Sequence, residues 1–89
     1  MVAVNTNVVA TDVVPLGGGR NDGKKLGFID SAAKASTDDT WTVTNATLVH
    51  MVIAIDDSAG TLDESTISTN VITLANASTG ATSALIVFS

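Results

Sequence analysis

Short runs in which apolar and polar residues alternate are the most informative pattern in this sequence. The clearest is the run 40–44, where Trp41 and Val43 alternate with three threonines. A period of two is typical of a strand that buries one face and exposes the other. We therefore expect Trp41 and Val43 to point into a core and the threonines to point toward solvent.

Two other runs are apolar on both faces. The run 47–55 has one face with Thr47, Val49, Met51, Ile53 and Ile55, and another with Leu48, His50, Val52 and Ala54. The run 83–88 has one face with Ala84, Ile86 and Phe88, and another with Leu85 and Val87. A two-layer sandwich of this length covers one face of each sheet, so we expect another subunit or a host surface to cover the second face. The alternative is that the stretch 59–69 folds over it.

The spacing of turn residues and the content of β-branched residues predict an all-β fold, a small antiparallel β-sandwich or barrel-like domain. Clusters of Gly, Asn, Asp and Ser separate the strand-like runs. The β-branched residues Val, Ile and Thr, which favour strands, make up 30 of the 89 positions. The expected strands are 2–4, 8–14, 26–29, 40–44, 47–55, 70–75 and 83–88, and the one plausible helical turn, short enough to be a loop, is 31–35.

The chain is expected to hold one sandwich domain, 17–89, preceded by an extended N-terminal arm, 1–16. The arm mixes β-branched residues with Asn5, Asn7 and Asp12. It is either an edge strand that pairs with a neighbouring chain or an ordinary first strand of its own domain.

Charge and composition exclude several classes of partner. Nine acidic residues against four basic ones give a net charge of −5. A nucleic-acid binder needs a basic surface, so neither nucleic acid nor an anionic membrane is an expected partner. With one histidine and no cysteine, a disulfide or a structural zinc site is not expected. Oligomerisation is a common substitute for such crosslinks in small domains.

The targeting signals that a sequence can reveal are also not expected here. No apolar run approaches the roughly 20 residues of a transmembrane helix. The first ten residues lack the basic segment and apolar stretch of a signal peptide.

The spacing of Gly18, Gly23 and Lys24 matches the start of a phosphate-binding loop. Such a loop continues with Ser or Thr for magnesium and opens a helix whose N-terminus faces the phosphates. Here Lys25 follows, and a strand-like run comes next. We therefore interpret the segment as a turn between strands and expect no cofactor.

The candidate catalytic and metal-binding residues also favour structural roles. Asp56, Asp57, Asp63 and Glu64 lack the spacing of a calcium-binding EF-hand loop, so we expect a solvated acidic loop, with ion binding left open. His50 lies in a strand-like run and is expected to be a core or interface histidine. Hydrolysis requires a nucleophile with a base, or two opposed carboxylates. The sequence offers no such set of residues, so we expect no enzyme activity.

Four segments in the C-terminal half share an order with a known class of protein. They are 39–43 (DTWTV), the apolar run 48–55, the segment 70–80 (NVITLANASTG) and the end 84–89 (ALIVFS). In this order, residues 38–89 resemble the small head decoration or cement proteins of tailed bacteriophages. The resemblance implies a β-rich module, often trimeric, on the outer surface of a capsid.

We therefore expect a non-enzymatic virion structural protein. It would assemble in the host cytoplasm, form a homo-oligomer with a trimer favoured, and bind the major capsid protein. The candidate contact residues are Val4, Val8, Val9 and His50. The alternatives are a β-sandwich module that binds carbohydrate or another ligand, and another virion component such as a tail or head-completion subunit.

Overall fold

The computed structural model describes residues 5–16, 23–34, 39–57, 60–75 and 80–89, with the backbone alone for 31–34 and 80. These residues form nine strands, which build two sheets. The strands are β1 (Asn5–Val8), β2 (Thr11–Pro15), β3 (Lys25–Lys34), β4 (Asp39–Val43), β5 (Val49–Asp56), β6 (Thr61–Asp63), β7 (Ser65–Ser68), β8 (Val71–Leu74) and β9 (Gly80–Phe88).

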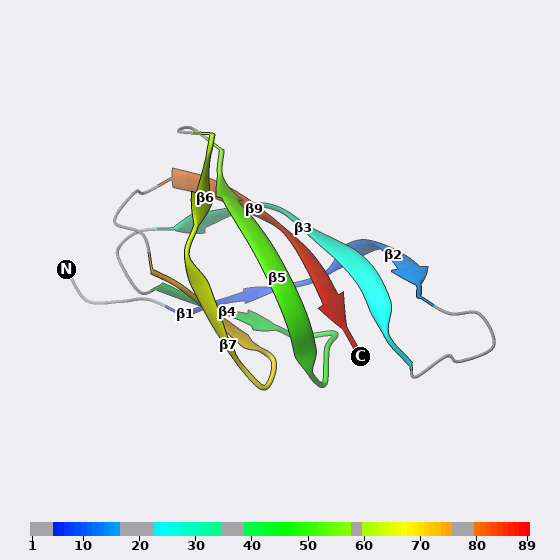
Figure 1. Ribbon diagram of the computed structural model, residues 1–89. Helices are drawn as coiled ribbons and strands as arrows, with labels where there is room; N and C mark the ends of the chain where they lie inside the picture. Colours follow the sequence, from blue (N-terminus) through cyan, green and yellow to red (C-terminus); the bar gives the residue numbers. More distant parts are fainter. Residues whose placement is uncertain (1–4, 17–22, 35–38, 58–59, 76–79) are drawn as a thin grey trace.

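The two sheets stack as a small β-sandwich, which confirms the predicted all-β fold. One sheet has four strands in the order β1-β4-β8-β7, and the other has five in the order β2-β3-β9-β5-β6. Strands β3, β9 and β5 lie in front of β1 and β4 in Figure 1. The pairing of β1 with β4 is parallel, and the other pairings in the two sheets are antiparallel.

The chain passes from one sheet to the other at both edges of the sandwich. At the first edge, Val9 and Ala10 connect β1 of the four-stranded sheet to β2 of the five-stranded sheet. At the second edge, Glu64 connects β6 to β7, and Figure 1 shows both connections as nearly continuous ribbons. We call these connections the Ala10 corner and the Glu64 corner. They close the sandwich in the manner of a flattened barrel.

Specific hydrogen bonds hold each corner. The Ala10 amide donates to Oδ1 of Asn45 at 3.0 Å, and Nδ2 of Asn45 donates back to the Ala10 carbonyl at 3.0 Å. The Ala75 amide donates to the Glu64 carbonyl at 2.8 Å. Because a corner interrupts the strand ladder, these bonds satisfy backbone groups that would otherwise lose their partners.

The core lies between the two sheets and contains Trp41 and Val43 on β4, as the alternating pattern predicts. Both side chains are 0% exposed. The threonines of β4 point away from the core, and the hydroxyls of Thr40 and Thr42 donate to Oδ1 of Asn5 on β1 at 2.7 and 3.0 Å. The other buried apolar residues are Val8, Ala10, Ile29, Ala46, Val49, Ala54, Ile72, Leu74, Ala84, Ile86 and Phe88.

An irregularity in β5 corrects the faces expected for the run 47–55. Val49 pairs with Phe88 and Met51 pairs with Val87, so His50 is an extra residue between two consecutive partners. Such a bulge shifts every side chain before it to the opposite face. Val49 is therefore buried with Ala54, whereas Met51 and the isoleucines after it are exposed. The prediction that Val49 shares a face with Met51 is wrong.

Other segments differ from the sequence-based expectation. Residues 31–34 belong to β3 and pair with β9 beyond a second register shift, so the predicted helical turn is a strand. The stretch expected as a loop, 59–69, contains β6 and β7, each at the edge of a sheet. The N-terminal segment supplies edge strand β1 to one sheet and edge strand β2 to the other, while the expected strand 2–4 lies outside the described residues.

Gly27 on β3 allows the five-stranded sheet to approach the Ala10 corner closely. A Cβ atom at this position would lie 2.8 Å from Cε1 of Phe88 and 2.9 Å from Cβ of Ala10. Contacts this short force neighbouring groups to move. The absence of a side chain at Gly27 therefore permits Phe88 and Ala10 to pack over the same backbone.

We expect Gly27→Ala to lower the free energy of unfolding by about 1–3 kcal/mol, measured by urea denaturation. At an unstrained site the same substitution stabilises a protein by about 0.4–1 kcal/mol, so the sign of the change is informative. The double variant Gly27→Ala/Ala10→Gly removes one of the two clashes and should recover part of the loss. An unchanged or increased stability of Gly27→Ala would contradict the close packing.

Candidate functional site

The side of the five-stranded sheet that faces away from the core is almost entirely apolar. Strand pairing arranges its side chains in three rows across the sheet. The rows are Val14, Leu26, Val87 and Met51; then Phe28, Leu85 and Ile53; then Ser83, Ile55 and Leu62. We call these ten side chains the outer face. The polar Thr11 pairs with Phe28 at the β2 end of the second row.

The outer face is open to solvent in the single chain. Six of its large aliphatic side chains, on β2, β5, β6 and β9, are between 41% and 66% exposed. Scattered exposed apolar residues are ordinary in soluble proteins, but a contiguous set of this size indicates a contact surface. The prediction that β9 is apolar on both sides is confirmed, because Leu85 is 44% exposed while Ala84 and Ile86 are buried.

The stretch predicted as an alternative cover does not lie over this surface in the described residues. Strand β6 extends the sheet beside β5, and β7 joins the other sheet beyond the Glu64 corner. Leu62 on β6 enlarges the outer face instead of covering it, since it pairs with Ile55. Residues 60–69 therefore leave the apolar rows exposed.

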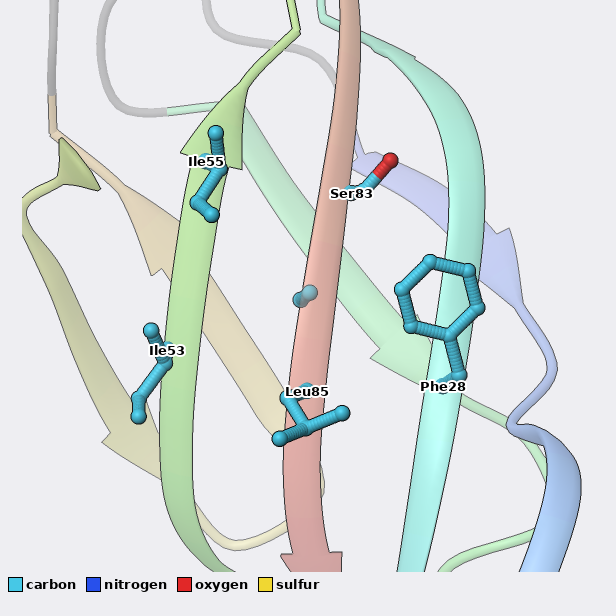
Figure 2. Close-up of a pocket in the computed structure, with 6 residues that line it drawn as sticks. Phe28, Ile53, Ile55, Ser83 and Leu85 are labelled. Carbon is cyan, nitrogen blue, oxygen red and sulfur yellow. The ribbon is translucent and has the colours of Figure 1, made fainter. Parts of the chain in front are cut away.

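A shallow hollow of about 230 Å³ lies within the outer face. Figure 2 shows its rim, with Phe28 on β3, Leu85 on β9, and Ile53 and Ile55 on β5. Ser83 supplies the hydroxyl at one end, and that hydroxyl donates to Oδ2 of Asp57 at 2.9 Å. A hollow with this lining accepts an aliphatic or aromatic side chain by burying it, and it offers no charged group to bind a polar ligand.

A second set of exposed apolar residues lies along the segment 9–16, at the edge of the same sheet. Val9, Val13 and Leu16 are all exposed, and β2 pairs with β3 on one side alone. We call these three residues the N-terminal edge. An edge strand presents backbone groups to which a neighbouring chain can add a strand.

The four contact residues predicted from the sequence have different environments. Val9 is 54% exposed at the Ala10 corner. Val8 belongs to the core of its own chain, which leaves it little surface for another molecule. Val4 lies outside the described residues.

His50 occupies the bulge of β5. It is exposed, so the core position considered for it is wrong. Its Nε2 atom lies 3.1 Å from the hydroxyl of Ser89, and a contact with another chain at this position stays a prediction.

The acidic residues of 56–64 do not form a solvated loop. Asp56 on β5 is 3% exposed and Asp63 on β6 is 5% exposed, whereas Asp57 and Glu64 are exposed. Strand pairing between β5 and β6 turns the first two toward the interior, and the hydroxyl of Thr82 donates to Oδ1 of Asp56 at 3.3 Å. The described residues contain no group of three or more His, Cys, Asp or Glu side chains placed to hold a metal ion.

The other sequence motifs have structural roles where the chain is described. Gly23 adopts a positive φ of 78° and Lys25 begins β3, so a strand stands where a phosphate-binding loop needs a helix. The remainder of that motif, 17–22, lies outside the described residues. The indole of Trp41 is fully buried and therefore offers no surface for stacking against a sugar. The described segments include no helix of the length and apolarity needed to span a membrane.

Comparison of the chain with protein-family models, with curated proteins and with solved structures gives no match in any of the three. The function of the chain is therefore inferred from its own surfaces. The largest of these is the outer face.

Substitutions of the adjacent β9 residues Thr82 and Ser83 test whether Asp56 is buried and Asp57 exposed. We expect Thr82→Val to lower the free energy of unfolding by about 1–2 kcal/mol, because it removes a donor from the buried Asp56 carboxylate. Ser83→Ala removes a donor from the exposed Asp57 and should change stability by less than about 0.5 kcal/mol. Thermal denaturation of both variants measures the difference, and equal effects would contradict the buried position of Asp56.

Proposed function

We propose that this chain is a virion structural protein of a tailed bacteriophage, which decorates the outer surface of the capsid and stabilises it. One observation carries the proposal: the sandwich exposes a contiguous apolar sheet face in addition to an apolar edge. A chain that functioned alone would gain solubility by replacing these residues with polar ones. Their presence favours a protein that is buried among others in an assembly.

The stabilising mechanism would be mechanical and would need no catalytic group. A protein that binds the assembled shell, and not the separate capsid subunits, adds its binding free energy to the assembled state alone. An interface of about 1,600 Å² in total is sufficient for stable, specific binding. Repetition over the many equivalent sites of a shell multiplies the effect.

The N-terminal edge is the surface that we assign to the major capsid protein. Its exposed valines provide apolar contact, and β2 offers an unpaired strand edge to a neighbouring strand. The net charge of −5 suits the outer side of a shell better than the inner side, which faces packaged DNA. The sequence resemblance of residues 38–89 to decoration proteins supports a place on the capsid surface, although it does not extend to the N-terminal edge.

The positions of the aromatic side chains make a sugar-binding module the less favoured alternative. Such modules present exposed aromatic rings on the surface, and none of the three aromatic side chains of this sequence is fully exposed. Trp41 and Phe88 are buried, and Phe28 is half-buried among the aliphatic side chains of the outer face.

The proposal predicts that the chain pellets with capsids. We expect a major capsid protein gene in the genome that encodes this chain, and empty heads assembled from that protein should bind the chain with saturation at a fixed number of copies per head. The decorated heads should also disassemble at a higher temperature than bare heads, measured by calorimetry. Absence of pelleting, or binding to tails instead of heads, would overturn the proposal.

Two lysine substitutions that change the net charge equally locate the contact. Val9→Lys places a charge in the N-terminal edge and should weaken binding to heads at least tenfold. Thr66→Lys alters an exposed position on β7 of the other sheet and should leave binding unchanged. Equal binding by both variants would place the contact elsewhere on the chain.

A further inference from the structure

The outer face is large enough to pair with a copy of itself. With about half of each of its six most exposed side chains accessible, it presents on the order of 600 Å² of apolar surface, the upper end of what a monomer exposes. Two copies packed face to face would bury roughly 1,200 Å², which is the lower limit for a stable, specific interface.

The charge distribution permits this pairing although each copy carries a net charge of −5. The three rows of the outer face contain no charged residue, so like charges do not meet within the contact. Lys24 lies at the end of the sheet beside the row of Leu26, just before β3 begins, whereas Lys25 points to the other side of the sheet, where its Nζ lies 5.5 Å from the centre of the Phe88 ring. Asp30 and Asp57 lie at the other end, beside the row of Ser83.

This polarity selects one arrangement of the two copies. A two-fold axis that lies between the faces and runs across the strands would place the lysine end of one copy over the aspartate end of the other. An axis parallel to the strands would instead place like charges over each other. The first arrangement makes β5 of one copy antiparallel to β5 of its partner.

The same arrangement places a projecting side chain opposite a hollow. With the axis near Ile53, Met51 of one copy faces Ile55 of the other, at the rim of the hollow shown in Figure 2. Met51 is 53% exposed, and a flexible methionine fills an irregular apolar hollow well. Each copy thus supplies both a projecting side chain and a hollow that receives it, as a two-fold interface requires.

We infer that the outer face binds a second copy of this chain through a two-fold axis across β5. The inference deepens the proposed function by naming the partner of this face, and it replaces the trimer implied by the sequence resemblance with a pair. Val9 and Val13 of the N-terminal edge remain outside the pair, since they do not belong to the three rows.

Sedimentation equilibrium of the whole chain tests the inference. The unmodified chain should be dimeric at micromolar concentration. Leu85→Lys, in the central row, should raise the dissociation constant at least 100-fold with an unchanged circular dichroism spectrum. Val9→Lys makes the same change in charge outside the face and should remain dimeric. If Leu85→Lys does not fold, the milder Ile53→Thr, which keeps a β-branched side chain at an exposed position, should still weaken the dimer.

The position of the axis is tested with single cysteines, because the sequence has none. Sheets packed face to face lie about 10 Å apart, so a short bifunctional maleimide should join Ile53→Cys chains across the axis. Val9→Cys chains should not be joined by the same reagent. A monomeric or trimeric wild type, a dimer that survives Leu85→Lys, or crosslinking through Val9→Cys alone would overturn the inference.

These experiments distinguish a failure of the predicted dimer from a failure of the proposed capsid binding. A dimer that is lost in Leu85→Lys but does not bind heads would support the inference and overturn the capsid proposal. A monomer that pellets with heads and loses binding through Val9→Lys would do the reverse.

Discussion

The structure depends on the closure of the sandwich at its two edges. At the Ala10 corner the chain leaves one sheet and enters the other within two residues, and Asn45 holds the turning backbone through two hydrogen bonds. At the Glu64 corner the same passage occurs at the opposite edge. Because both edges are joined by continuous chain, the two sheets are fixed over each other with one common core. Most of the exposed large apolar side chains then lie on the outside of the five-stranded sheet and along its N-terminal edge.

Regular alternation in the sequence predicted the strands whose pairing is regular. Trp41 and Val43 are buried as expected, because β4 pairs along its length without a shift. The same reasoning failed in β5, where the extra residue at His50 moves Val49 to the face opposite the one expected. No local pattern announces such a bulge, since it is set by the register with β9, more than thirty positions away.

Short polar strands were missed for a related reason. Strands β6 and β7 have few apolar residues, and their hydrogen-bonded partners, not their own sequence, keep them extended. Their pairing also explains why Asp63 is buried in a segment that composition alone assigned to a solvated loop. For the candidate site, the sequence predicted a second apolar face, but not the hollow. Its rim combines Phe28, Ile53 and Leu85, which only the pairing of three distant strands brings together.

The Ala10 corner also has a consequence for the order in which the chain folds. The strand before it pairs with Thr40 to Val43, and the corner itself is held by Asn45, so the N-terminal segment finds its partners only after about half of the chain has been synthesised. Sheets built from such distant pairings fold in roughly milliseconds to seconds, more slowly than structures with local contacts. The five-stranded sheet forms later still, because its middle strand, β9, is the last of the nine strands in chain order. The outer face, whose central row includes Leu85 on β9, is therefore assembled only after the partners of the Ala10 corner have been synthesised, so two chains meet through this face late in folding.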